Sequence, residues 1–154
     1  MPTSPVCVDA NIVVTIVAPE VQRPLALSLW RSWLKQDREI VAPRLLVYEV
    51  TSALWRKVRH DVLTLEEARR AVQAALGMGV TILDPPGLSE QAFELAARFQ
   101  RPAAYDAHYL ALAKILGCEF WTADARLAIA VKEELPWVRH LGESQLPHVK
   151  VPGT

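Results

Sequence analysis

Apolar and polar positions along the chain follow two alternating periods. Short apolar runs bounded by Pro, Gly or Asp are typical of buried strands. The sequence predicts five such strands, at Val6–Asp9, Glu39–Ala42, Val80–Leu83, Glu119–Thr122 and Trp137–Leu141. Longer stretches, with apolar residues three and four positions apart, lie between them and predict helices. The predicted helices are Glu20–Arg38, Arg44–Arg59, Thr64–Met78, Ser89–Phe99, Asp106–Leu116 and Ala125–Glu134.

Local signals mark two of the helix boundaries. Thr64 is followed three residues later by Glu67, which is the spacing of a capping box at a helix start. Gly117 follows the apolar helix 106–116 and can adopt the positive φ that ends a helix. Strands that alternate with helices predict a mostly parallel sheet covered on both faces. In such folds the functional site lies beyond the carboxyl ends of the strands, and candidate residues are sought there.

Acidic residues occupy two of these strand ends. Asp9 ends the first predicted strand, and Asp124 follows the fourth. A carboxylate at the end of a buried strand is costly unless it is paired or bound to a metal. Both residues also precede helical sequence, where Asp is a favoured N-cap. A helix cap and a metal ligand are therefore both open interpretations for these two residues.

A third acid, Glu49, lies inside the predicted helix 44–59. The expected core stripe of this helix is Val47, Val50, Leu54 and Val58. At about 100° per residue, Glu49 lies roughly opposite that stripe, and its own face carries Leu45, Ser52, Ala53 and Arg56. Small neighbours allow a ligand to approach closely, which favours a position at a cleft. An exposed Glu on an outer helix face is the alternative.

The fourth acid, Asp106, is the sole acid at the head of a very apolar helix, whose Leu110, Ala113 and Leu116 are expected in the core. The helix dipole alone would stabilise it there. Its position also directs a carboxylate at the sheet edge. Four acids near one edge of a parallel sheet favour a hard divalent cation such as Mg²⁺, which prefers oxygen ligands and keeps several waters. Phosphodiester cleavage can use two such ions, about 4 Å apart.

Four motifs in series, VDAN, PRLLVYEVTSAL, YDAHYLALA and WTADARL, resemble the acidic signature of PIN-domain nucleases. The resemblance covers nearly the whole chain, and by pattern it is nearest to the VapC-type toxins of bacterial and archaeal toxin–antitoxin pairs. It implies a three-layer α/β/α sandwich with a five-stranded parallel sheet. It implies supporting polar roles for Asn11 and Thr122, the latter by hydrogen bonding. The metal ligands that it implies are Asp9, Glu49, Asp106 and Asp124.

The resemblance also implies an activity and partners. The expected activity is two-metal hydrolysis of RNA phosphodiester bonds by an endoribonuclease that uses Mg²⁺ or Mn²⁺. The expected partners are RNA, a small VapB-type antitoxin and a second copy of the chain. Two alternatives stay open. One is a non-catalytic module with the same fold, and the other is a phosphatase with an Asp nucleophile in a D-x-D loop. Asn11, two residues after Asp9, weakens the phosphatase hypothesis.

Composition narrows this picture. The 154 residues fit one domain, predicted over residues 1–146 with a tail at 147–154. With 51% hydrophobic and 22% charged residues, the chain is typical of a globular protein and not of a disordered one. No apolar run approaches the roughly 18 residues that span a bilayer. The start of the chain does not have the features of a signal peptide. The two cysteines, Cys7 and Cys118, lie in apolar contexts that favour buried thiols in a reducing cytoplasm.

The net charge of zero bears on nucleic-acid binding. A protein that coats nucleic acid is usually strongly basic, so any RNA contact here must be local. Arg56 shares the face of Glu49 and is the first candidate for holding a phosphate near the metals. Arg44 and Arg126 are further candidates, the second because it follows Asp124 closely.

Overall fold

The computed structural model describes residues 4–145, so the predicted tail at 147–154 lies outside the described residues. All five predicted strands and all six predicted helices are present, with ends shifted by up to three residues. The strands are β1 (Val6–Val8), β2 (Ile40–Ala42), β3 (Thr81–Ile82), β4 (Glu119–Thr122) and β5 (Val138–His140). The helices are α1 (Ala10–Val17), α2 (Arg23–Lys35), α3 (Leu45–Arg59), α4 (Leu65–Leu76), α5 (Leu88–Arg98), α6 (Tyr105–Leu116), α7 (Ala125–Val131) and the 3₁₀ helix η1 (Leu141–Gln145).

Helix α1 is the main difference from the predicted elements, because the cap interpretation of Asp9 implied helical sequence after it but no helix range was predicted there. Its sequence, ANIVVTIV, has six buried residues among eight and is rich in β-branched side chains. A helix that is buried nearly all round has no polar face, so its sequence lacks the period that identifies an amphipathic helix. Burial against the sheet and the neighbouring helices therefore makes this segment helical despite its strand-like composition.

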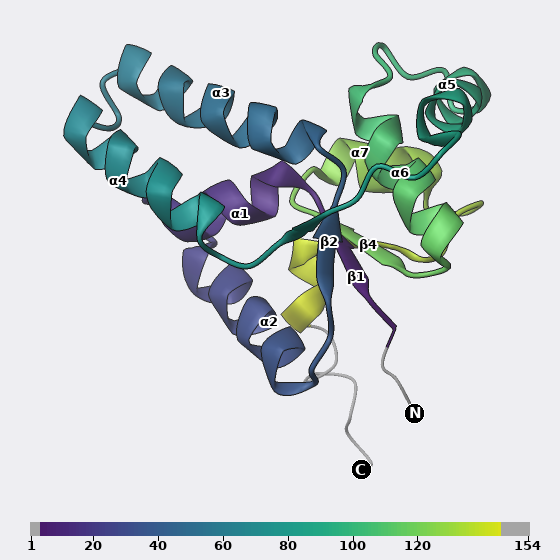
Figure 1. The fold of residues 1–154 in the computed structure, drawn as a ribbon, viewed down its shortest axis with the longest axis horizontal. Helices are drawn as coiled ribbons and strands as arrows, with labels where there is room; N and C mark the ends of the chain where they lie inside the picture. The colour runs from purple at the N-terminus through teal and green to yellow at the C-terminus, as the bar shows by residue number, and fades with distance from the viewer. Residues whose placement is uncertain (1–3, 146–154) are drawn as a thin grey trace.

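The sheet is parallel throughout, in the order β3-β2-β1-β4-β5. The chain runs outward from β1 to β3 and then crosses to the other side of β1 through β4. Helices α1 to α4 lie on one side of the sheet and α5 to α7 on the other (Figure 1). This arrangement confirms the three-layer sandwich. It also places the carboxyl ends of β1 and β4 side by side at the reversal of strand order, where ligand sites form in such sheets.

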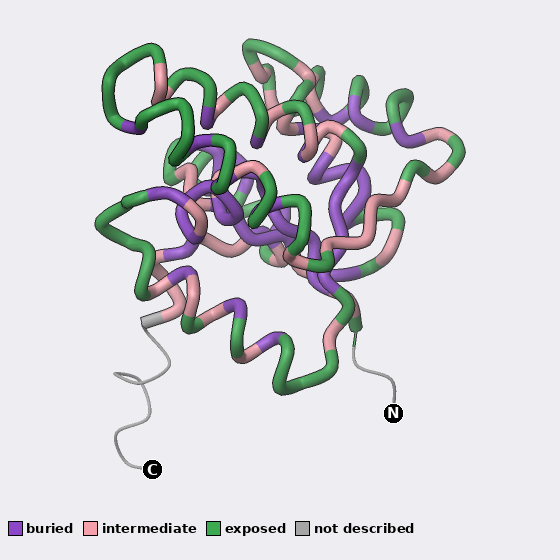
Figure 2. The backbone as a smooth tube through the Cα atoms, turned by 60° about the vertical axis from the view of Figure 1, so that its left-hand side comes forward, coloured by how far each residue is buried: buried purple, intermediate pink, exposed green. Residues whose placement is uncertain are grey.

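The core fills the space between the strands and the inner faces of the helices (Figure 2). The ring of Tyr109 in α6 stacks on Phe120 of β4, with 5.7 Å between ring centroids. In α3 the buried residues are Leu46, Val50 and Leu54. The expected stripe was therefore partly wrong, since Val47 and Val58 are only half-buried.

Among the helices of residues 4–145, none combines the length and the apolar composition of a membrane-spanning segment.

Candidate active site

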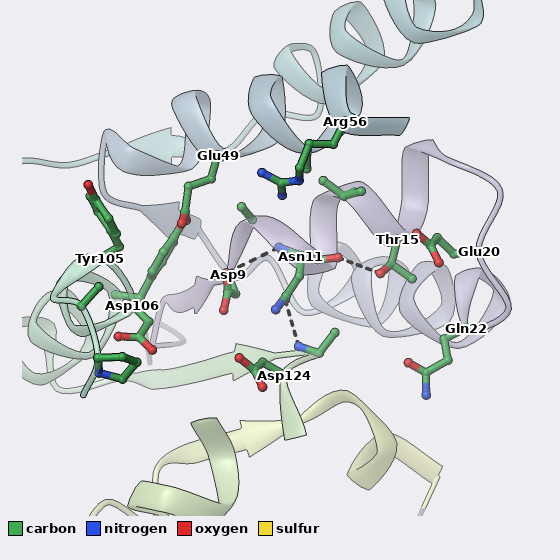
Figure 3. A pocket seen from close by; sticks show the side chains of 17 residues that line it. Asp9, Asn11, Thr15, Glu20, Gln22, Glu49, Arg56, Tyr105, Asp106 and Asp124 are labelled. Carbon is green, nitrogen blue, oxygen red and sulfur yellow. Dashed lines mark hydrogen bonds between the residues drawn. The ribbon is translucent and has the colours of Figure 1, made fainter. Parts of the chain in front are cut away.

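One pocket at the carboxyl edge of the sheet contains all four acids expected in the site. Its volume is about 550 Å³. The acids come from four elements, which are the end of β1, the middle of α3, the first turn of α6 and the loop after β4. Figure 3 shows Asp9 and Asp124 near the middle of the pocket and Asp106 towards one end. Glu20 and Gln22 lie at the opposite end.

Asp9 is both a helix cap and a pocket residue. It is buried, and its Oδ1 accepts a long hydrogen bond of 3.5 Å from the Asn11 amide at the start of α1. Its Oδ2 accepts a bond of 2.9 Å from the Thr122 hydroxyl. Burial raises the pKa of Asp9 to about 7, and the nearby carboxylates of Glu49 and Asp124 act in the same direction. The two hydrogen bonds oppose this shift without cancelling it.

The Thr122 hydroxyl joins the ends of β1 and β4. It accepts hydrogen bonds from the Asn11 side-chain amide at 3.2 Å and from the Asp124 backbone amide at 2.9 Å. With both of its lone pairs engaged, its single proton is directed at Asp9. Asn11 also accepts a bond of 2.9 Å from the Ala123 amide. Asn11 and Thr122 thus hold the two strand ends together beneath the acids.

Asp124 caps α7 in the way that Asp9 caps α1. Its Oδ1 accepts hydrogen bonds from the amides of Arg126 at 2.9 Å and Leu127 at 3.2 Å. A cap and a pocket position are therefore compatible in both residues, and the two interpretations offered by the sequence are not exclusive.

Glu49 meets the pocket through a contact that the sequence analysis did not identify. The Tyr109 hydroxyl donates a hydrogen bond of 2.6 Å to Glu49 Oε1. Burial raises the pKa of Tyr109, and the negative charges of Asp9 and Glu49 raise it further, so the phenol stays neutral and remains a donor. Tyr109 stands three residues after Asp106 on α6, a spacing that places both on one helix face.

Asp106 is held by a charged partner. Arg101, just before α6, donates to Asp106 Oδ2 from Nη2 at 2.9 Å and from Nε at 3.3 Å. The other oxygen, Oδ1, is buried and has no hydrogen-bond partner among residues 4–145. A buried carboxylate oxygen without a partner is uncommon and marks a place where a further ligand fits.

The four candidate metal ligands in this pocket suit a hard cation, because all of them are carboxylates. Among the described residues, however, no three His, Cys, Asp or Glu side chains are close enough to hold one ion together. The acids therefore line one pocket without converging on a single point. An ion bound here would take one or two of these carboxylates and complete its coordination with water, as Mg²⁺ commonly does.

The three arginines expected to bind phosphate lie in different places. Arg56 lines the pocket from α3, and its Nη1 donates to the Ser52 hydroxyl at 3.3 Å. Arg44 and Arg126 are exposed and lie outside the pocket lining.

Three further residues of the pocket lining were not predicted from the sequence. One is Tyr105, which lies at the rim and is 64% exposed. Glu20 and Gln22 were missed as well, and nothing in the sequence distinguishes these loop residues from ordinary surface residues.

Comparison with known sequences finds a matching protein family and curated relatives. The PIN domain family matches residues 6–133. VapC ribonuclease Mb0985 of Mycobacterium bovis is 36% identical over 107 residues, which cover 66% of this chain and 82% of that protein. Ribonuclease VapC3 of Pyrobaculum aerophilum is 28% identical over 123 residues, which cover 79% of this chain and 90% of that protein.

Two solved structures resemble the fold. PAE2754 from Pyrobaculum aerophilum superposes with a TM-score of 0.63 at 23% identity, over 82% of this chain and 86% of that one. Mycobacterium tuberculosis VapC20, a toxin that cleaves the sarcin-ricin loop, gives a TM-score of 0.61 at 20% identity, over 81% and 94%. At these identities the likeness concerns the fold alone.

Proposed function

The chain belongs to the PIN-domain family, in its VapC group, and from this premise we propose that it is a metal-dependent endoribonuclease, the toxin of a toxin–antitoxin pair. The proposed reaction is hydrolysis of RNA phosphodiester bonds with Mg²⁺ or Mn²⁺. The observation that carries the proposal is the state of Asp9. It is a buried carboxylate bonded only by neutral donors and surrounded by further acids.

Such a group favours a cation strongly. Its desolvation and the negative charge of Glu49 and Asp124 act against ionisation, and a divalent ion relieves both. We propose that Asp9, Glu49, Asp106 and Asp124 hold the ions, with Asn11 and Thr122 fixing Asp9 in place. When bound, two divalent ions would activate water for attack and neutralise charge on the phosphate. No side-chain nucleophile is required of the chain.

The remaining roles follow from position. Arg56 lines the pocket and offers a guanidinium suited to a phosphate oxygen. Because Arg44 and Arg126 lie outside the lining, we limit the proposed contact at the cleaved phosphate to Arg56. Arg101 is a positioning residue that holds Asp106. RNA as substrate is supported by the ribonuclease relatives.

Family membership also supports three proposals about organisation. The partner would be a small VapB-type antitoxin, the assembly a homodimer, and the nuclease domain residues 1–146 in one unit. Trp55 and Tyr48 on α3 are 54% and 60% exposed. Large aromatic side chains at the surface suit contact with another protein.

A non-catalytic module of the same fold is the rival hypothesis. It is favoured by one observation, that no three of the described acids are placed to share an ion. Calorimetric titration with Mn²⁺ separates the two hypotheses. Binding that disappears in Asp9→Asn supports the nuclease, whereas no heat at millimolar Mn²⁺ supports the module.

The nuclease itself is tested by two single substitutions. Asp9→Asn and Asp106→Asn keep the shape of each side chain but remove its charge, and each should reduce EDTA-sensitive RNA cleavage by about 100-fold or more. Asp37→Asn is the matched control, because Asp37 is exposed, lies outside the pocket and has a positive φ that Asn tolerates. Full cleavage by either pocket variant, with cooperative thermal unfolding retained, would overturn the assignment.

A further inference from the structure

Three cations form a row on α2, called here the α2 stripe, which consists of Arg23, Arg31 and Lys35. They form one row along the helix with Leu27, because the four residues follow one another at intervals of four positions. Pro24, Ser28 and Ser32 lie beside them, and together these residues line an open groove of about 520 Å³ on the surface of α2. At about 1.5 Å per residue, the row extends for about 18 Å along the helix.

Every charged residue that lines this groove is a cation. Helix α2 contains no acid, and none lines the groove. Within the described part of the chain, no member of the stripe forms an ion pair with a carboxylate. On α4, by contrast, Arg69 and Arg70 both pair with Glu66. In a chain of zero net charge, an uncompensated row of cations along a groove indicates a polyanionic ligand.

The α2 stripe begins one residue from the catalytic pocket. Gln22, the N-cap of α2, lines the pocket, and Arg23, the next residue, lines the groove. Figure 3 shows Glu20 and Gln22 at the end of the pocket away from Asp106. The one acid at this junction, Glu20, is neutralised by Lys57 at 2.6 Å. A polyanion leaving the pocket at this end meets no unpaired negative charge from Glu20 before it reaches Arg23.

From this proximity and the uncompensated charge we propose that the α2 stripe binds the phosphate backbone of the RNA that flanks the cleaved bond. This inference rests on the proposed function, since it takes RNA as the occupant of the adjoining pocket. Arg and Lys contacts to phosphate fix the position of a strand without reading its bases. The stripe therefore adds affinity for RNA of any sequence, and the affinity depends on a strand long enough to leave the pocket.

The test uses the full chain and the double variant R31Q/K35Q, which removes two exposed charges. Arg23 is left in place because its Nε donates to the Ile16 carbonyl at 2.7 Å and so supports the end of α1. The matched control is R69Q/R70Q, which makes the same change in net charge on α4. The probe is a mixed-sequence single-stranded RNA of about 30 nucleotides, longer than the usual site of a single-strand-binding fold. Binding is measured in EDTA, so that cleavage does not interfere.

The expected result is a Kd raised about 10-fold or more in R31Q/K35Q at low salt, with little change in the control. The dependence of log Kd on log salt should also become shallower by about 1.4, because each lost phosphate contact on a single strand removes about 0.7. An unchanged Kd and slope, or equal weakening in R69Q/R70Q, would overturn the proposal. So would wild-type protein that binds no RNA, or phosphatidylserine vesicles that bind through the stripe while RNA affinity is unaffected.

The two proposals fail separately. If the pocket variants lose cleavage but R31Q/K35Q binds RNA as the wild type does, the α2 stripe is wrong and the nuclease stands. If R31Q/K35Q loses RNA affinity but Asp9→Asn still cleaves, the metal site is wrong and the stripe stands as a binding surface. Thermal unfolding of each double variant checks that the fold is retained, and the exposed positions make retention the expected result.

Discussion

Asp9 and Asp106 face the same pocket, yet their surroundings differ in kind. Asp9 is buried at the end of β1, and its two hydrogen bonds come from neutral groups. Asp106 is half-buried at the start of α6, and its principal partner is the guanidinium of Arg101. Negative charge is thus uncompensated at one side of the pocket and partly compensated at the other. The contrast suggests that Asp9 supplies most of the attraction for a cation, while Arg101 limits the charge near Asp106.

The largest expected effect concerns Asp9 and pH. Its folded pKa of about 7 lies above the value near 3.9 of an unfolded Asp, so the folded state holds the proton more tightly. The free energy of unfolding of the metal-free protein should therefore fall as pH rises from about 4 to 7 and level off above 7. Asp9→Asn cannot ionise, so it should be more stable than the wild type at pH 8 by a few kcal/mol.

Denaturant unfolding in EDTA at several pH values measures this difference. The lowered pKa values of Glu67 and Glu143 act in the opposite direction but only below about pH 4.5, and they are common to both proteins. The gap between variant and wild type should open between about pH 4 and 7, and saturating Mn²⁺ should narrow it by stabilising only the wild type. A gap that does not change with pH would show that the charge of Asp9 has no destabilising effect.

Removing the cation that pairs with Asp106 should change stability less than removing the charge of Asp9. It should affect stability and Mn²⁺ affinity in opposite directions. Arg101→Gln breaks a partly buried ion pair and should lower the stability of the metal-free protein by about 1–2 kcal/mol. It also removes the positive charge that is paired with Asp106, so Mn²⁺ should bind more tightly, by on the order of 10-fold. Unfolding and calorimetric titration give the two quantities.

Arg98→Gln is the control for Arg101→Gln. It makes the same chemical change in the exposed Arg98–Glu134 pair, away from the pocket, and should alter neither stability nor Mn²⁺ affinity by much. If Arg101→Gln left Mn²⁺ affinity unchanged or weakened it, Arg101 would be needed to present Asp106 to the ion, and the contrast with Asp9 would not hold.

The sequence predicted the positions of the acids better than their surroundings. Asp9 and Asp124 could be placed at the sheet edge, because an acid after a short apolar run is a local pattern. The bond from Thr122 to Asp9 depends on the pairing of β1 with β4, which joins residues 113 positions apart. Local periodicity does not specify which strands become neighbours.

The same limit applies to the residues that hold the other two acids. The bond between Tyr109 and Glu49 links α6 to α3, and its formation depends on how those helices sit across the carboxyl edge. The range of helix α1 was not predicted for a related reason, since its burial comes from neighbours that the segment does not encode. The spacing of Arg23, Arg31 and Lys35 is visible in the sequence, but the absence of carboxylates opposite them becomes evident only in three dimensions.

The smallest expected effect comes from Tyr109, a neutral donor that makes the surroundings of Glu49 resemble those of Asp9. Tyr109→Phe keeps the ring stacked on Phe120 but removes the hydroxyl that donates to Glu49. Because Glu49 is half-buried and faces the pocket, water can replace part of the lost bond, and stability should fall by about 1 kcal/mol or less. With Glu49 less well positioned, kcat for RNA cleavage should fall up to about 10-fold while KM changes little. Tyr48→Phe, an exposed neighbour on α3, is the matched control and should leave both constants unchanged. A Tyr109→Phe protein that raised KM at constant kcat would place the hydroxyl in contact with the RNA, and Glu49 would then be positioned without it.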